Sequence, residues 1–192
     1  APRTGSISWL GQPLDVRSRG ALRALRADVQ IVFQDPLASL DPRMTVLEIL
    51  SEPLREFRPD LTSQARAQAA VAIVERVGLS SEALRRYPHE LSGGQCQRIG
   101  IARALILGPK LLVCDEAVSS LDVSVQAQIV NLLTRLQREL GLSMIFISHN
   151  LAVVRHVCQR VLVLYLGRVM ELAGREELFR SARHPYTQRL LS

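Results

Sequence analysis

The sequence is poor in cysteine, lysine and aromatic residues, and it contains no long apolar run. It has three cysteines, and aromatic side chains make up only 4% of its 192 residues. The cysteines lack metal-ligand spacing, so we expect reduced, buried thiols and no disulfide framework. No apolar run approaches the ~20 residues that a membrane-spanning helix needs. These absences favour a soluble globular domain and argue against a disulfide-stapled scaffold or an integral membrane protein.

The formal charge of +6 could indicate a nucleic acid or an anionic membrane surface as partner. The arginines are scattered, however, and the short group at Arg17, Arg19, Arg23 and Arg26 has no aromatic residues interleaved with it. A solvated face explains this charge better. We expect no nucleic-acid partner.

The run from Leu91 to Gln95 reads Leu-Ser-Gly-Gly-Gln and precedes a periodic apolar stretch that predicts a helix over 95–107. Glycines let the backbone approach an anion, and the first N–H groups of a helix carry the positive end of its dipole. Ser92 adds a hydroxyl donor. The run therefore predicts a phosphate socket, against the simpler alternative of a serine-capped helix.

A second site is indicated where the apolar run 111–114 ends in Asp115 and Glu116. Such a run predicts a strand buried on both faces, and parallel sheets bind ligands at the carboxyl ends of their strands. Two carboxylates there suit magnesium and catalysis, although they could also be solvated acids at a strand end.

Downstream, an apolar stripe predicts a helix over 123–140, followed by Gly141 as its C-cap and by a strand over 144–147. This second strand ends at Ser148 and His149. Strand, helix and strand with polar residues at both strand ends indicate a crossover unit of a nucleotide-binding sheet.

Together these motifs resemble those of the ATP-binding subunits of ABC transporters, in the same order along the chain. They are the Q-loop at Val32–Pro36, the signature at Leu91–Gln95, the Walker B strand at Leu111–Glu116, the D-loop at Ser119–Asp122, and the H-switch at His149. The resemblance implies an α/β fold: a partial P-loop NTPase, RecA-like parallel sheet core, with an inserted helical signature subdomain and antiparallel edge strands.

On this basis we expect residues 1–34 and 110–192 to form the ATPase core and residues 35–109 to form the helical signature subdomain. Thr45 and Glu48 predict a capping box at the start of a helix. The other expected elements are an edge hairpin-like segment before a strand over 29–33, helices over 46–54 and 63–77, a hairpin of strands 161–166 and 169–172, and short helices over 175–180 and 185–191.

Finer details resemble the oligopeptide and dipeptide importer branch. They are Gln34–Pro36 with Ser39–Arg43, Cys96–Arg98 after the signature, and His184–Thr187 near the end. Importers of nickel, glutathione or other small solutes in this branch remain alternatives. A non-transport ABC ATPase of DNA repair or translation is another, but it would predict coiled-coil or zinc insertions that the helical region does not show.

The resemblance implies ATP and Mg²⁺ as ligands and two ATPase subunits paired head to tail, identical or different. Ser92, Gly93, Gly94 and Gln95 would then contact the γ-phosphate of ATP held by the partner subunit. Asp122 would relay the state of one site to the other across the dimer.

The remaining roles fall at the strand ends. Asp115 would orient Mg²⁺ through water, and Gln34 would sense both the ion and the attacking water. Glu116 is the expected general base, and His149 would contact the γ-phosphate. A strand-end packing histidine is the alternative for His149, and Asn150 departs from the aspartate of many relatives. Gln34 and Asp122 could also be purely structural.

Transmembrane permease subunits would face the loop after Gln34, and an external solute-binding protein would act indirectly. The resemblance thus implies peripheral attachment at the cytoplasmic face of the membrane.

One motif of the family is absent, the P-loop G-x-x-x-x-G-K-[ST] that holds the nucleotide phosphates. The only lysine is Lys110, which lies in no such motif. We therefore expect a fragment that lacks the N-terminal P-loop part and cannot bind ATP by itself, a signature-bearing binding module. A degenerate subunit that lost the loop is the alternative.

Overall fold

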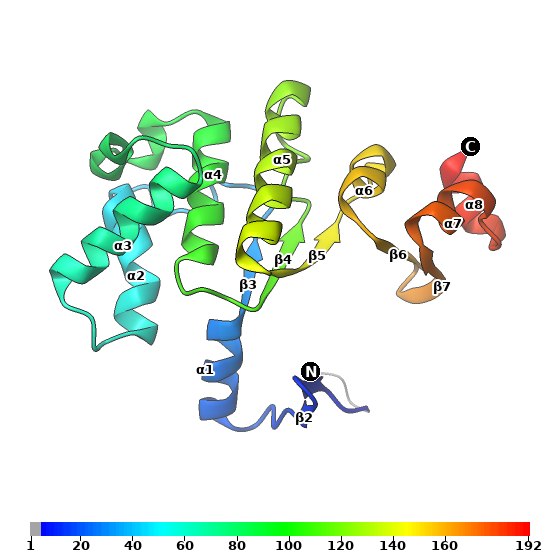
Figure 1. Ribbon diagram of the computed structural model, residues 1–192, viewed down its shortest axis with the longest axis horizontal. Coiled ribbons are helices and arrows are strands. Elements are labelled where there is room, and N and C mark those ends of the chain that lie inside the picture. The colour runs from blue at the N-terminus through cyan, green and yellow to red at the C-terminus, as the bar shows by residue number, and fades with distance from the viewer. Residues whose placement is uncertain (1–4) are drawn as a thin grey trace.

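The computed structural model describes residues 5–192, so the first four residues of the predicted 1–34 segment lie outside the described part (Figure 1). In chain order the elements are β1 Ser8–Trp9, β2 Gln12–Pro13, α1 Arg19–Asp28, β3 Val29–Val32, α2 Val46–Phe57, α3 Ser63–Arg76, the 3₁₀ turns Ser81–Arg85 and Pro88–Glu90, α4 Gly93–Leu105, β4 Leu111–Asp115, α5 Val123–Leu140, β5 Ser143–Ile147, α6 Leu151–Val157, β6 Arg160–Tyr165, β7 Arg168–Gly174, α7 Arg175–Ser181 and α8 Pro185–Leu191.

Three parallel strands in the order β3-β4-β5 form the central sheet. Val32 pairs with Cys114, and Asp115 pairs with Ile147, so the three strands end at one edge. Two antiparallel pairs, β1 with β2 and β6 with β7, complete the described strands. The predicted parallel core and the predicted hairpin are therefore confirmed.

The prediction that the strand over 111–114 is buried on both faces was wrong. Leu112 and Cys114 are at most 1% exposed, whereas Val113 between them is only half-buried. On the neighbouring strands Ile31 and Ile145 face the same way as Val113 and are 45% and 50% exposed. Alternate residues of a strand point to opposite faces, and α4 and α5 join the core cluster on one face only. In the described part of the chain the other face is largely uncovered.

Local hydrogen bonds explain where the helices begin. The Thr45 hydroxyl oxygen accepts from the Glu48 amide, and the Glu48 carboxylate accepts from the Thr45 amide, which confirms the predicted capping box at α2. Helix α4 begins at Gly93 and ends at Leu105, two residues earlier than predicted at each end. Its N-cap is Ser92, so the two signature glycines belong to the first helical turn.

Two helices were missed by the sequence analysis. Ser18 caps α1, a short helix rich in arginine in which Ala21, Leu22 and Leu25 share one face but no residue is fully buried. Asn150 caps α6, whose short apolar sequence does not distinguish a helix from a strand.

The core is shared between the sheet and the helices that follow it. Buried side chains of α2, α3, α4 and α5 form one apolar cluster with those of β3 and β4. A smaller cluster of Val154, Val161 and Leu178 joins α6, β6 and α7. The boundary of the helical subdomain at 35–109 therefore stays a prediction. Within residues 5–192, every helix is too short or too polar to span a lipid bilayer.

Candidate functional site

Most of the predicted site residues lie at the carboxyl edge of the parallel sheet. Gln34 follows β3, Asp115 ends β4, Glu116 follows it, and His149 lies two residues beyond β5. Because the strands are parallel and paired in register, their carboxyl ends meet at this edge. Figure 1 shows the first turns of α4 and α5 at the same end of the sheet.

Glu116 and His149 are in direct contact. The Nδ1 atom of His149 lies 3.0 Å from Oε1 of Glu116, and the side chains are 72% and 29% exposed, respectively. An ionised carboxylate can only accept hydrogen bonds, so Nδ1 is then the donor and Nε2 faces outward as the free ring nitrogen. The pair thus places a carboxylate and an imidazole within reach of a ligand at the sheet edge.

The backbone of Glu116 is in the left-handed region, with φ of 47°. A residue with a side chain is uncommon there, and such conformations concentrate at functional sites. Hydrogen bonds hold this geometry: the Glu116 amide donates to Ile147 O at 3.0 Å, and the Glu116 carbonyl accepts from the amide and hydroxyl of Ser119, both at 3.0 Å. The carboxylate is therefore aimed by its backbone as well as by His149.

Asn150 supports the position of His149. Its Oδ1 accepts from the amides of Ala152 at 3.1 Å and Val153 at 3.3 Å, and the Asn150 amide donates to Ser148 Oγ at 3.0 Å. Asparagine and aspartate both cap helices through this oxygen. The departure from aspartate thus leaves the helix cap beside His149 intact.

The Q-loop and D-loop segments also touch. Ser120 Oγ donates to the carbonyl of Gln34 at 3.0 Å, across 86 residues of chain. Asp122 stands at the N-cap position of α5, but its exposed carboxylate makes no capping hydrogen bond. The Asp122 side chain is consequently available to a group outside its own helix.

Asp115 and Gln34 are exposed at the edge, as a metal-facing pair requires. No group of three or more His, Cys, Asp or Glu side chains that could hold a metal occurs within residues 5–192. Mg²⁺ prefers oxygen ligands, keeps several waters and uses only one or two carboxylates beside substrate phosphates. One exposed carboxylate and one amide fit that ion, and do not fit a metal that needs a closed protein cage.

The signature residues form a capped helix start. Ser92 Oγ accepts from the Gln95 amide at 3.3 Å, and Gln95 Oε1 accepts from the Ser92 amide at 2.9 Å. The alternative of a serine-capped helix is therefore confirmed, and the phosphate socket stays a prediction. Within residues 5–192 the Ser92 hydroxyl donates no hydrogen bond, so its hydrogen is free.

Gly94 has a packing role that the sequence analysis missed. A Cβ atom on Gly94 would lie 2.7 Å from Cγ1 of Val125 on α5, whereas one on Gly93 would lie 3.8 Å from Leu121. The second glycine is thus required for α4 to approach the start of α5 closely. Among the described residues, no hydrogen bond or ion pair joins Ser92–Gln95 to Asp115, Glu116 or His149.

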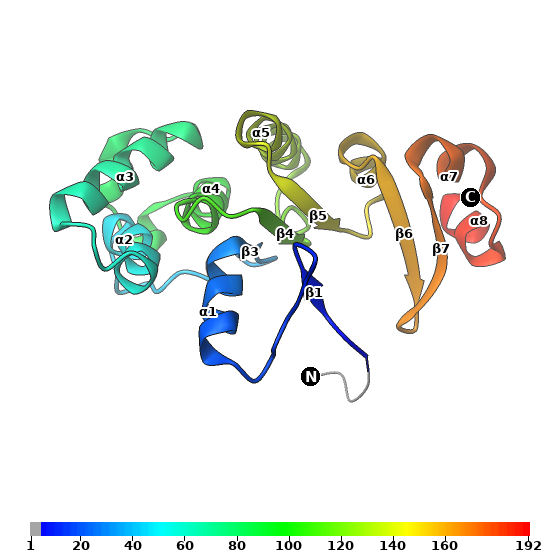
Figure 2. The same cartoon turned by 60° about the horizontal axis from the view of Figure 1, so that its bottom comes forward.

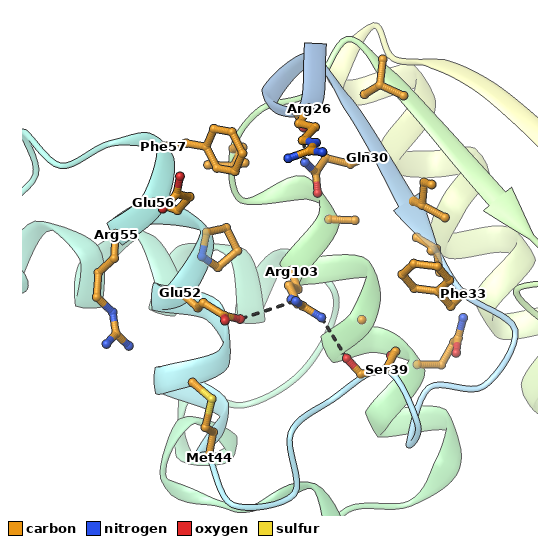
Figure 3. A pocket seen from close by; sticks show the side chains of 18 residues that line it. Arg26, Gln30, Phe33, Ser39, Met44, Glu52, Arg55, Glu56, Phe57 and Arg103 are labelled. Carbon is orange, nitrogen blue, oxygen red and sulfur yellow. Dashed lines mark hydrogen bonds and ion pairs between the residues drawn. The ribbon is translucent and has the colours of Figure 1, made fainter. Parts of the chain in front are cut away.

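Beside this edge lies a cavity of about 700 Å³, which no sequence motif predicted (Figure 3). It is lined by α1, β3, the loop after Gln34, α2 and α4, and it is open to solvent. Arg103 of α4 crosses it: Nη1 donates to Ser39 O at 2.9 Å, and Nη2 lies 3.5 Å from Glu52 Oε2. The far end of the signature helix is therefore connected to the segment that follows Gln34.

Comparison with known proteins decides the family. The family model of the ABC transporter matches residues 1–119. The chain belongs to the ABC transporter family.

Its relatives among ABC proteins include importer subunits. The chain is 56% identical over 188 residues to the oligopeptide transport ATP-binding protein OppF of Escherichia coli (strain K12), covering 98% of this chain and 56% of OppF. It is 52% identical over 189 residues to the glutathione import ATP-binding protein GsiA of the same strain, covering 98% of this chain and 30% of GsiA. The chain thus spans just over half the length of OppF.

Solved structures confirm the predicted ABC ATPase fold. CbiO1 from Clostridium perfringens, part of an ABC transporter complex, aligns with a TM-score of 0.82 at 29% identity, covering 94% of this chain and 70% of that one. The ATP-binding cassette MJ0796, a dimer bound to ADP and Pi, aligns with a TM-score of 0.77 at 26% identity, covering 91% and 75%.

Proposed function

We propose that this chain is part of an ATP-hydrolysing subunit that energises the import of peptides or related small solutes. The similarity to OppF and GsiA supports this solute class. The observation that carries the enzymatic part is the 3.0 Å contact between His149 and Glu116 at the carboxyl edge of a parallel sheet. This contact supports Glu116 as the general base and His149 as a group that contacts a phosphate.

In this reaction Glu116 accepts a proton from the attacking water, while His149 orients the Glu116 carboxylate and presents its outer ring nitrogen to the γ-phosphate. Asp115 and Gln34 are the residues that would hold Mg²⁺, through its water shell. The ion neutralises phosphate charge when it is bound.

The signature residues act on a nucleotide held by a second ATPase subunit. In the described residues no hydrogen bond or ion pair joins them to Glu116 or His149, whereas their helix start and free Ser92 hydroxyl suit an anion. In a head-to-tail dimer that anion is the γ-phosphate of ATP on the partner subunit. Gln95 keeps Ser92 in position for this contact. Asp122, which makes no capping bond, contacts the partner subunit.

ATP is held mainly by residues other than the strand-end and signature residues named above. Lys110 pairs with Asp28 at 2.9 Å where β4 begins, away from the carboxyl edge. No other lysine is available in the sequence to contact phosphates. The 192 residues alone therefore bind ATP weakly and do not hydrolyse it.

Membrane-spanning permease subunits dock at the cavity behind Gln34. The cavity adjoins both the Q-loop segment and the signature helix, and its lining combines apolar side chains with arginines and glutamates. The subunit is accordingly a peripheral protein of the cytoplasmic membrane face, and an external solute-binding protein contacts the permease rather than this chain.

The test uses the full-length subunit in its assembled transporter, with Glu116→Gln. Turnover is expected to fall at least a hundredfold while equilibrium ATP binding and ATP-induced dimer closure persist, because only the base is lost. Phosphate release and nucleotide affinity are measured, and Glu176→Gln on α7 is the matched control. Normal turnover in the Glu116 variant would remove Glu116 from the base role.

A further inference from the structure

The C-terminal end of α3 is capped by two arginines that belong to other helices. The last carbonyl groups of a helix have no partner inside that helix. Nη1 of Arg98 on α4 donates to Val77 O at 2.7 Å, and Nη2 of Arg135 on α5 donates to Arg76 O at 2.9 Å. Positive groups at this end also oppose the negative end of the helix dipole. Three helices therefore meet at the end of α3.

Gly78, which follows α3, leaves room for this arrangement. Its φ is 78°, and a Cβ atom on it would lie 3.0 Å from Nη1 of Arg98. The amides of Gly78 and Leu79 donate to Glu75 O at 2.9 Å and to Val74 O at 3.0 Å, so these two carbonyls are satisfied within the segment. A side chain in place of the glycine would be strained and would crowd the guanidinium. The end of α3 is thus shaped to admit Arg98.

Arg98 also joins α4 to α5. Its Nη2 donates to Oε1 of Gln128 at 3.3 Å. About one turn earlier on both helices, Gly94 lies against Val125, where a Cβ atom on the glycine would be 2.7 Å from Cγ1. Residues three or four apart share one face of a helix, so these two contacts follow each other along one interface. One guanidinium therefore fixes α4 to both of its neighbours, and Figure 1 shows α4 between them.

The signature lies close to this joint. Ser92, the N-cap of α4, precedes Arg98 by six residues, and Asp122, at the N-cap position of α5, precedes Gln128 by six residues. Six residues span about 9 Å of a helix. A tilt of α4 against α5 at the joint would therefore change the separation of Ser92 and Asp122.

We propose that Arg98 is a positioning residue for the signature. Its guanidinium fixes α4 between the end of α3 and the side of α5, and so holds Ser92 where the second ATPase subunit presents its γ-phosphate. This rests on the proposed function, in which the signature acts on ATP held by that subunit. Water would cap α3 in place of Arg98, but it would not tie α4 to α5.

The test compares Arg98→Gln with Arg135→Gln in the full-length subunit. Both changes remove a charged donor from the end of α3, so both should lower the denaturant midpoint to a similar extent. Only Arg98→Gln releases α4, because the described bonds of Arg135 reach α3 and Glu139 but not α4.

In Arg98→Gln the ATP concentration for half-maximal dimer closure should rise about tenfold, the loss expected for a hydrogen bond to a charged group. The KM for ATP in the assembled transporter should rise with it. Arg135→Gln should keep the wild-type values. The nucleotide affinity of the isolated, unpaired subunit should stay unchanged in both variants, because the signature does not contact nucleotide in the same subunit.

Gln128→Leu is an exposed change that keeps α3 capped and removes only the bond between α4 and α5. It should fold normally and raise the half-maximal ATP concentration about threefold. Combined with Arg98→Gln it should add little, because both changes remove the same contact.

Equal rises in Arg98→Gln and Arg135→Gln would show that only the stability of α3 matters, and would overturn the inference. Closure at wild-type ATP concentrations in both Arg98→Gln and Gln128→Leu would overturn it as well, while leaving the proposed function standing. A wild-type subunit that does not dimerise with ATP would instead contradict the proposed function, and this inference with it.

Discussion

The two faces of the parallel sheet are built from the same kinds of residue but have very different surroundings. On one face Leu112 and Cys114 are packed under helices and almost completely buried. On the other, Ile145 and Ile147 are 50% and 46% exposed. Figure 2 shows α5 and α6 on one side of the strands, with α1 and β1 on the other. An apolar run thus predicts a strand, but it does not tell how many of its faces are covered.

The largest expected difference between the faces is in thiol reactivity. Burial raises the pKa of the Cys114 thiol to about 12. At pH 8 its thiolate is scarce, so Cys114 should react with a maleimide more than about a thousandfold more slowly than an exposed cysteine. Ile145→Cys places a comparison thiol on the open face. Peptide mapping after timed labelling measures both rates, and similar rates would show that the covered face opens readily.

Truncation on the covered face should cost the most stability. Leu112→Ala leaves a cavity under α4 and α5, and we expect a loss of about 2–5 kcal/mol in the free energy of unfolding. Urea denaturation measures this. A loss below about 1 kcal/mol would mean that the helices do not pack on the strand as described.

Ile145→Ala is the matched change on the open face. Half of this side chain is already in water, and little cavity forms, so we expect a loss of about 1 kcal/mol or less. The same denaturation experiment applies. If the two variants lost equal stability, some other part of the protein would have to cover the open face in solution.

The smallest effect concerns Asp28, where the sheet begins. The indole N–H of Trp9 donates to Oδ2 of Asp28 at 2.9 Å, and Lys110 Nζ lies 2.9 Å from the same oxygen. These two partners, Trp9 first, lower the pKa of Asp28 below its ordinary value of 3.8. The stabilisation is therefore complete above about pH 4 and is lost as the pH falls below it.

Asp28→Asn should remove this acid-dependent part of stability, about 0.5 kcal/mol at neutral pH. Fluorescence of Trp9, the only tryptophan, reports the local change. An unaltered acid titration of the fluorescence in the variant would exclude Asp28 as its source.

The elements predicted best are those fixed by local rules. Helices α5 and α8 have the predicted bounds, because Gly141 at φ of 59° ends one and Pro185 begins the other. Helix α1 was missed although Ala21, Leu22 and Leu25 share one face, because the arginines of this short segment were interpreted only as a solvated charged group. Local sequence also gave no account of the uncovered sheet face, since burial there depends on distant segments.

In the site, too, some features could be predicted from the sequence and others could not. Parallel strand ends predicted that Glu116 and His149 would lie near each other, and their contact agrees. The left-handed backbone of Glu116 could not be predicted. Residues other than glycine rarely adopt this conformation, and the sequence has no other feature that indicates it at this position. The cavity lining comes from segments scattered over residues 26–107, and it exists only after they pack.

Helix α4 has 13 residues and is therefore about 20 Å long. Ser92 lies at its N-terminal end. The rest of the helix forms one wall of the cavity behind Gln34, and that wall includes Gln97 and Arg103. A continuous helix moves as a stiff rod, so a tilt of about 5° at the cavity would displace the serine by roughly 1.5 Å, given the rise of each residue. A displacement of Ser92 by about half the length of a hydrogen bond is enough to form or break its contact with a phosphate. The motion requires no hinge, because the helix tilts as one rigid element.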